Sequence, residues 1–262
     1  MNAVIESLTN HRSVRKYRPQ PIEPDKMDAI LEAATRAATA GNLQMYTLLV
    51  IDRPEDLKRL DEALEVPFIE RSGCPAAILA LVDLHRVKSW INLHTEREIV
   101  CNRPYNFFMA IWDALIAMQN AVAAAESLGL GTCCLGSGVE LDIQQLFGAP
   151  ELVFPAGLVC LGYPEALPQK SMRLPLEAVV HRNCYHLPKA EDINRWYDER
   201  DHVWDKVPEE RKNTLAQQNI HGIAEALSVQ KFSREIVEKR SRGILKNLRQ
   251  SGFDLRTGLD QD

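Results

Sequence analysis

The feature that most constrains the fold is a long apolar stretch between Tyr105 and Leu128, in which Asp113 and Glu126 are the only charged residues. Its length and composition predict one long helix, and Gly129 is a suitable residue to end it. A helix that is apolar on nearly all sides has to be covered on nearly all sides. One body can provide that cover, but a second subunit provides it more easily. We therefore expect a homodimer built on this helix.

The overall composition is that of an ordinary globular protein. Hydrophobic residues make up 45% of the 262 residues and charged residues 26%, with a formal net charge of −5. This composition excludes a disordered or collagen-like chain, and the acidic balance argues against a nucleic-acid partner. Asp113, Gln119 and Asn120 interrupt the apolar stretch, which disfavours a membrane span. The N-terminal residues do not resemble a signal peptide, so we expect a cytoplasmic protein without nucleic-acid or membrane partners.

The first 188 residues are typical of a mixed α and β body. Short, almost continuously apolar segments predict strands at 46–51, 76–82, 132–135 and 156–162, and helical spacing predicts helices at 2–10, 24–39, 54–64, 105–128 and 141–147. Apolar strands separated by helices indicate a sheet that is covered on both faces. Charged residues become denser after residue 188. We therefore expect a body over 1–188 and a charged helical extension over 189–262, with helices near 191–201, 209–226 and 228–250.

Residues 11–15, with the sequence HRSVR, form the first candidate site. Two guanidinium groups and a hydroxyl within four residues suit an oxyanion, because the planar fork of arginine matches phosphate oxygens. In an extended segment Ser13 and Arg15 point to the same side and Arg12 to the other. Ser13 and Arg15 would then bind one phosphate directly, with Arg12 reaching it through its length. A solvated basic turn is the alternative that these five residues alone leave open.

Two further segments combine small residues with polar or glycine-rich sequence. Residues 38–44 place Asn42 and Gln44 after small residues, so that a planar heterocycle could come close and be bound by amide donors and acceptors. A helix-ending turn is the alternative there. Residues 129–138 contain four glycines around a short strand, which allows the backbone to approach a ligand. The adjacent cysteine pair in this segment could suggest redox chemistry, but small side chains beside a ligand are the simpler interpretation.

The remaining polar clusters are weaker signals. Lys170 and Arg173 follow the last predicted strand and could complete an anion site. His181, Cys184 and His186 are metal-ligand types within six residues, but a distant fourth ligand is not evident, so we expect no metal. The Gly-x-Ser-x-Gly sequence of many serine hydrolases is absent, which argues against that class.

Taken together, these segments resemble the nitroreductase family of flavin enzymes. The resemblance is carried by HRSVRKYRPQPI, AATRAATAGNLQMYTLLVI, DALIAMQNAVAAAESLGLGTCCLG, AGLVCLGYPE and MRLPLEAVVHRNCY, in the family's order and spacing over residues 5–187. It implies an α+β fold, a central sheet flanked by helices, and an obligate homodimer with two FMN molecules at its interface. Two positions depart from the family's pattern: Met45 stands where many relatives have proline, and Gly136 stands where some have an acidic residue.

The resemblance also implies which residues bind FMN. The residues near the phosphate would be His11, Arg12, Ser13, Arg15, Lys170 and Arg173; those approaching the flavin from the other subunit would be Thr39, Ala40, Asn42 and Gln44; and those along the isoalloxazine ring would be Cys134, Leu135 and Gly136.

The function that the resemblance implies is that of an FMN-dependent NAD(P)H oxidoreductase. NAD(P)H would deliver hydride to flavin N5 and leave, and a nitroaromatic, quinone or related acceptor would then take the electrons in a ping-pong cycle. We expect no side chain to act as a nucleophile, general acid or general base. Two alternatives stay open: a specialised reductase of the same family for one metabolite, such as an alkene or a halogenated phenol, and a protein that binds FMN without catalysis.

Overall fold

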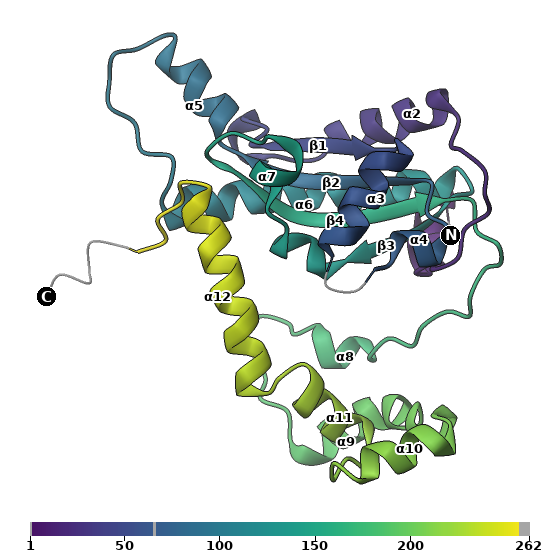
Figure 1. The fold of residues 1–262 in the computed structure, drawn as a ribbon. Coiled ribbons are helices and arrows are strands. Elements are labelled where there is room, and N and C mark those ends of the chain that lie inside the picture. Colours follow the sequence, from purple (N-terminus) through teal and green to yellow (C-terminus); the bar gives the residue numbers. More distant parts are fainter. Residues whose placement is uncertain (1, 65–66, 257–262) are drawn as a thin grey trace, which may run out of the picture. The chain divides into compact units, whose positions relative to one another are not determined.

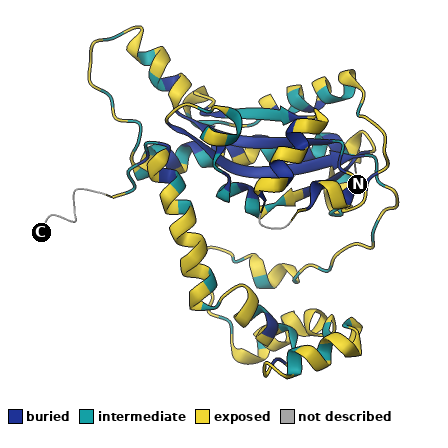
Figure 2. Ribbon diagram, in the orientation of Figure 1, coloured by how far each residue is buried: buried dark blue, intermediate teal, exposed yellow. Residues whose placement is uncertain are grey.

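A computed structural model describes residues 2–64 and 67–256, and its body is built on a four-stranded antiparallel sheet (Figure 1). The strands are β1 (Tyr46–Ile51), β2 (Ala76–Asp83), β3 (Gly131–Leu135) and β4 (Val153–Gly162), in the spatial order β1-β2-β4-β3. Every residue of β2 and β4 is buried, as the dark blue centre of Figure 2 shows. A central strand pair that is buried on both faces explains why these two segments are almost continuously apolar.

Helix α6 (Pro104–Ser127) is 24 residues long and packs along one face of the sheet. The side that it buries is rich in alanine, at Ala110, Ala114, Ala117, Ala121 and Ala125. These small side chains let the helix come very close to β4. A Cβ added at Gly157 of β4 would lie 2.9 Å from the sulfur of Met118 in α6, which shows how closely the helix and the strand approach at this crossing.

The opposite side of α6 is exposed in the single chain. It carries large apolar side chains at Tyr105, Phe108, Trp112, Leu115 and Ile116. Within the described part of the chain, α6 is also the one helix whose length and composition would suit a membrane span, although its alanine side packs on the sheet. A single chain therefore covers the alanine side of α6 and leaves the large apolar side chains on its other side exposed.

Short helices cover the other face of the sheet. They are α3 (Pro54–Ala63), α4 (Ile69–Ser72) and α7 (Ile143–Phe147). Leu60, Ile69 and Ile143 from these helices share one apolar cluster with Leu79 of β2 and Leu158 of β4. The predicted cover on both faces of the sheet is thus present.

Two more helices of the body lie beside α6. Helix α2 (Pro24–Thr35) buries Ile30 and Ala34 in the cluster that also holds the C-terminal half of α6. Helix α1 (Ala3–Thr9) contacts α6, and its apolar residues Val4, Ile5 and Leu8 are exposed. The exposed apolar surface of the body therefore includes α1 as well as α6.

Contacts divide the chain into two compact units, Met1–Gln169 with Arg242–Asp262, and Lys170–Ser241. The second unit contains α8 (Leu176–Val179), α9 (Ala190–Asp201), η3 (Trp204–Lys206), α10 (Glu209–Ala216), α11 (Ile223–Gln230) and the start of α12 (Arg234–Gln250). Within the first unit, Ser251 and Phe253 follow α12 and are buried in the core, where the Phe253 ring lies 5.1 Å from the ring of Phe107. The expected functional division into a body over 1–188 and an extension over 189–262 stays a prediction.

Some elements differ from the prediction. The second helix ends at Thr35 instead of residue 39, because the residues that follow form a separate loop. The segment 209–226 forms two helices, since Asn219 adopts a left-handed φ of 57° between them. The last helix begins at Arg234 instead of Ser228. Helix α5 (His85–Asn92) was not predicted, because its sequence mixes polar and apolar residues over two turns only.

Candidate functional site

The first candidate segment lies beside β3. Ser13 forms an isolated parallel bridge with Thr132, and the Val14 amide donates to the Thr132 carbonyl oxygen at 2.8 Å. Val14 is buried, Ser13 is half-buried and Arg15 is exposed, as expected when side chains alternate along an extended segment. Arg15 Nη1 also donates to the Ser13 carbonyl oxygen at 3.3 Å. The structure therefore brings Ser13 and Arg15 together on the outward side of this segment.

His11 is held by a carboxylate at the end of α6. Its Nδ1 lies 2.7 Å from Glu126 Oε1, and the same oxygen accepts a hydrogen bond from Thr132 Oγ1 at 2.5 Å. The Glu126 side chain is 13% exposed. These contacts join the last turn of α6 to β3 and to the first candidate segment. His11 therefore lies beside Ser13 and is held there by Glu126.

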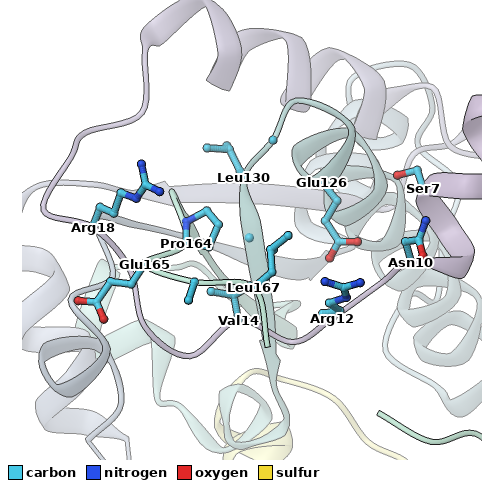
Figure 3. Close-up of a pocket in the computed structure, with 13 residues that line it drawn as sticks. Ser7, Asn10, Arg12, Val14, Arg18, Glu126, Leu130, Pro164, Glu165 and Leu167 are labelled. Atoms are coloured by element: carbon cyan, nitrogen blue, oxygen red, sulfur yellow. The ribbon is translucent and has the colours of Figure 1, made fainter. Parts of the chain in front are cut away.

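Arg12 lies on the other side of the segment, in a surface cavity of about 540 Å³ (Figure 3). The residues that line this cavity include Arg12, Val14, Arg18, Glu126 and Leu167. The buried Arg12 Nε has no hydrogen-bond partner among the described residues. Neither Ser13 nor Arg15 lines this cavity. The structure thus separates Arg12 from the Ser13 and Arg15 pair, and its reach to the same phosphate stays a prediction.

The second candidate segment, residues 38–44, falls in the connection between α2 and β1, where Thr39–Met45 forms a strained loop. Ala40, Gly41 and Asn42 form a short 3₁₀ turn, and positive φ angles occur at Gly41 (56°), Asn42 (55°) and Gln44 (50°). Left-handed backbone at two non-glycine residues in one loop is uncommon and costly. The side chains of Asn42 and Gln44 are exposed.

Two charged side chains hold this loop from within the first unit. Asp113 of α6, which is 2% exposed, accepts the Ala40 amide on Oδ1 at 2.9 Å and the Met45 amide on Oδ2 at 3.2 Å. Arg86 of α5 donates from Nη2 to the carbonyl oxygens of Gln44 at 2.6 Å and Tyr46 at 2.8 Å. The loop is therefore held at the backbone while its amide side chains stay outside.

The third candidate segment is the end of β3 and the turn that follows. Cys133 is buried, Cys134 is exposed, and both are free thiols. Desolvation raises the pKa of each thiol, so both stay neutral near pH 7. Leu135 is half-buried, and Gly136 is exposed with nothing within 4 Å of an added Cβ. The backbone at Gly136 is open to a ligand, as the glycines predict.

The last two candidate residues, Lys170 and Arg173, belong to the second unit. Both are exposed, and Arg173 Nη1 donates to the Met172 carbonyl oxygen at 3.0 Å. Their approach to the first segment stays a prediction. In the same unit, Cys184 Sγ lies 3.6 Å from His186 Nε2. Among the described residues, however, no group of three His, Cys, Asp or Glu side chains is arranged to hold a metal ion.

Sequence reasoning missed two residues that shape the site. Arg86 gave no signal, because its partners are carbonyl oxygens about 40 positions earlier in the chain. Glu126 is one of the two charges in the apolar stretch, and the sequence gives no sign that it binds His11 and Thr132. Asp113, the other charge in that stretch, is buried and accepts two backbone amides.

An antiparallel sheet packed on an apolar helix, with a Ser-x-Arg segment beside its edge strand, defines an α+β ligand-binding body. Comparison with known proteins agrees with this class. The nitroreductase family model matches residues 8–163. An FMN reductase [NAD(P)H] of Bacillus subtilis is 36% identical over 189 residues, covering 71% of this chain and 75% of that protein. An FMN reductase (NADPH) of the same organism is 33% identical over 193 residues, covering 71% of this chain and 76% of that protein.

A solved structure extends the likeness to most of the chain. NfrA2 of B. megaterium is similar with a TM-score of 0.81 and 26% identity, covering 98% of this chain and all of that chain. The protein belongs to the nitroreductase family. The predicted family and the predicted α+β fold class are confirmed, and the expected enzyme class, an FMN-dependent NAD(P)H oxidoreductase, is that of the named relatives.

Proposed function

We propose that this protein binds FMN and transfers electrons from NAD(P)H to a small-molecule acceptor, such as a nitroaromatic, a quinone or free flavin. The observation that carries the proposal is the pairing of residues 13–15 with β3, in a member of this family. This pairing presents the Ser13 hydroxyl and the Arg15 guanidinium on one side, beside a strand that is followed by the open backbone of Gly136. An arginine and a short hydroxyl donor suit a phosphate.

The described residues fit FMN in their donor chemistry. Ser13 and Arg15 would hold the phosphate, and the exposed amides of Asn42 and Gln44 offer the donors and acceptors that a flavin ring requires. Bound FMN supplies the two-electron chemistry, and the protein supplies position and electrostatics. Since the thiols of β3 stay protonated near pH 7, we assign no proton transfer to them.

The same proposal includes a homodimer in the cytoplasm. Helices α6 and α1 both expose large apolar side chains, and exposed apolar surface of this kind marks sites of protein association. A second copy would cover it and would bring the Thr39–Met45 loop of one subunit to the flavin of the other. Analytical ultracentrifugation of the purified protein should give the mass of two chains, and a monomer at micromolar concentration would contradict this part.

The experiment that tests the function is anaerobic reduction of the flavin. The purified protein should be yellow, and NADH or NADPH should bleach its flavin absorbance. Failure to bleach with either donor, with FMN bound, would favour a protein that binds FMN without catalysis. Parallel lines in double-reciprocal plots at several acceptor concentrations would support ping-pong turnover.

A panel of acceptors separates the broad reductase from a specialised one. Nitroaromatics, quinones, free FMN, activated alkenes and halogenated phenols should be compared by kcat/KM. We expect several classes to be reduced. Turnover confined to one alkene or one halogenated phenol would favour the specialised alternative, with the charged residues 189–262 as the segment to examine next.

A further inference from the structure

We propose that Asp113 is a positioning residue, which sets the conformation in which the Thr39–Met45 loop binds the flavin ring, and that Arg86 assists it from α5. The inference rests on the proposed FMN function. It assigns a role to two side chains that lie behind the loop, on its backbone side, and that act on the flavin through the loop alone.

The first step is the strain in the loop. Asn42 and Gln44 both adopt left-handed backbone, at φ of 55° and 50°, where L-residues other than glycine are disfavoured. Such conformations persist only where the surroundings fix them. The exposed side chains do little of this fixing, since the hydrogen bond from Gln44 Nε2 to the Asn42 carbonyl oxygen is long, at 3.4 Å.

The second step is the placement of the Asp113 carboxylate. Each of its two oxygens accepts one backbone amide, from Ala40 at the start of the loop and from Met45 at its end. One planar group therefore fixes the separation of the two loop ends. Because Asp113 is 2% exposed in an otherwise apolar helix, these two amides also provide the hydrogen bonds that a buried carboxylate needs.

The third step is the contribution of Arg86. Its Nη2 donates to the carbonyl oxygens of Gln44 and Tyr46, the residues on either side of Met45, whose amide Asp113 holds. Its Nε lies 3.7 Å from Asp83 Oδ2 at the end of β2, which orients the guanidinium. The Arg86 side chain is 54% exposed, so we expect it to matter less than Asp113.

The consequence is that the backbone and the side chains of the loop have different roles. The backbone amides and carbonyls are bound by Asp113 and Arg86, and the amide side chains of Asn42 and Gln44 stay available to the ring. A flavin that binds such a loop does not have to order it, which lowers the entropic cost of binding.

The test compares FMN with riboflavin, which has the ring and lacks the phosphate. In Asp113→Asn, an NH2 group replaces one carboxylate oxygen and faces a backbone N–H donor. We expect the Kd for FMN and the Kd for riboflavin to rise by the same factor, about tenfold or more. Arg15→Ala, which affects the phosphate, should raise the Kd for FMN and leave that for riboflavin unchanged.

Asp56→Asn is the matched control. Asp56 is also a buried carboxylate, but it lies on α3 and is paired with Arg53 at 2.5 Å and Arg59 at 3.1 Å. The Asp56→Asn substitution should lower the stability of the flavin-free protein in urea. It should leave the Kd for FMN and the Kd for riboflavin as in the wild type. Unchanged flavin binding in Asp113→Asn, or loss of FMN binding without loss of riboflavin binding, would overturn the inference while leaving the proposed function standing.

Two measurements keep the inference testable if Asp113→Asn does not fold. Arg86→Met should raise both Kd values by an equal, smaller factor, and no change in either would contradict the role of Arg86. In the flavin-free wild type, the Ala40 and Met45 amides should exchange slowly with solvent, and fast exchange at both would contradict the role of Asp113. A wild type that binds neither flavin would overturn the proposed function and this inference together.

Discussion

The two segments of the first unit that are expected to bind FMN are held in place by different means. Residues 13–15 are held by main-chain pairing, with the Val14 amide bonded to the Thr132 carbonyl oxygen of β3. The Thr39–Met45 loop is held by the side chains of Asp113 and Arg86, which bind its backbone from two helices. The first arrangement uses ordinary extended backbone, and the second uses left-handed backbone that needs outside support.

This difference indicates which substitutions should disturb each segment. Main-chain pairing survives most side-chain changes, so substitution of Ser13 or Arg15 should affect the ligand contact alone. A loop held by side chains depends on residues far from it in sequence, so a substitution in α6 or α5 can change it without touching the flavin. The predictions below separate these two kinds of effect.

The largest expected effect is that of Arg15→Ala on FMN binding. Loss of a charge-assisted contact with the phosphate should weaken FMN binding by about 1.5–3 kcal/mol. Stability without flavin should not change, because Arg15 is exposed and its segment is held by the backbone. Fluorescence titration with FMN measures the first quantity and urea unfolding the second. Arg53→Ala, another exposed arginine, is the control, and equal FMN affinity in both variants would refute the assignment of the phosphate.

The next effect is that of Gly131→Ala on the pairing itself. A Cβ at this position would lie 2.5 Å from a methyl carbon of buried Val14, so the segment would have to move away from β3. We expect a loss of about 1–3 kcal/mol in the free energy of unfolding, with weaker FMN binding as a result. Urea unfolding with and without FMN checks both. Gly243→Ala, in the interior of α12 where an added Cβ meets nothing within 4 Å, should instead raise the free energy of unfolding by about 0.5–1 kcal/mol and leave FMN binding unchanged.

The smallest effect is that of Asn42→Gly on the loop. Glycine relieves the left-handed strain but adds chain entropy to the unfolded state, so stability should change by less than about 1 kcal/mol. Flavin affinity should fall by about 0.5–1.5 kcal/mol because the amide is lost. Asn219→Gly removes a similar left-handed asparagine in the second unit and should leave flavin binding intact. Equal flavin affinity in Asn42→Gly and Asn219→Gly would show that Asn42 does not bind the flavin.

The sequence predicts much of this fold because its signals are local. Continuous apolar runs locate all four strands, and alternation along residues 12–15 predicts that Ser13 and Arg15 share a side. The start of β4 is missed, because Pro155 inside the strand hides it. The antiparallel order β1-β2-β4-β3 is not encoded in any one segment, since each pairing joins parts of the chain that are distant in sequence.

The site is harder to predict than the fold for the same reason. Asp113 is visible as a charge in an apolar helix, yet its partners are amides of Ala40 and Met45, which carry no side-chain signature. Arg86 is one exposed arginine among many until the structure places it beside the loop. The roles of Lys170 and Arg173 rest on the family resemblance and stay predictions.

The alternation along β3 has a practical consequence for watching the protein at work. Cys134 faces outward where the flavin ring is expected, while its neighbour Cys133 is buried, as are Cys74 and Cys160. In a background with both Cys101→Ser and Cys184→Ser, which removes the other thiols that are not buried, a maleimide dye at mildly alkaline pH would therefore label Cys134 ahead of the buried thiols. If added FMN protects that thiol, the fraction of Cys134 that is labelled would report how much of the protein has FMN bound. Mass spectrometry can measure this fraction without any turnover.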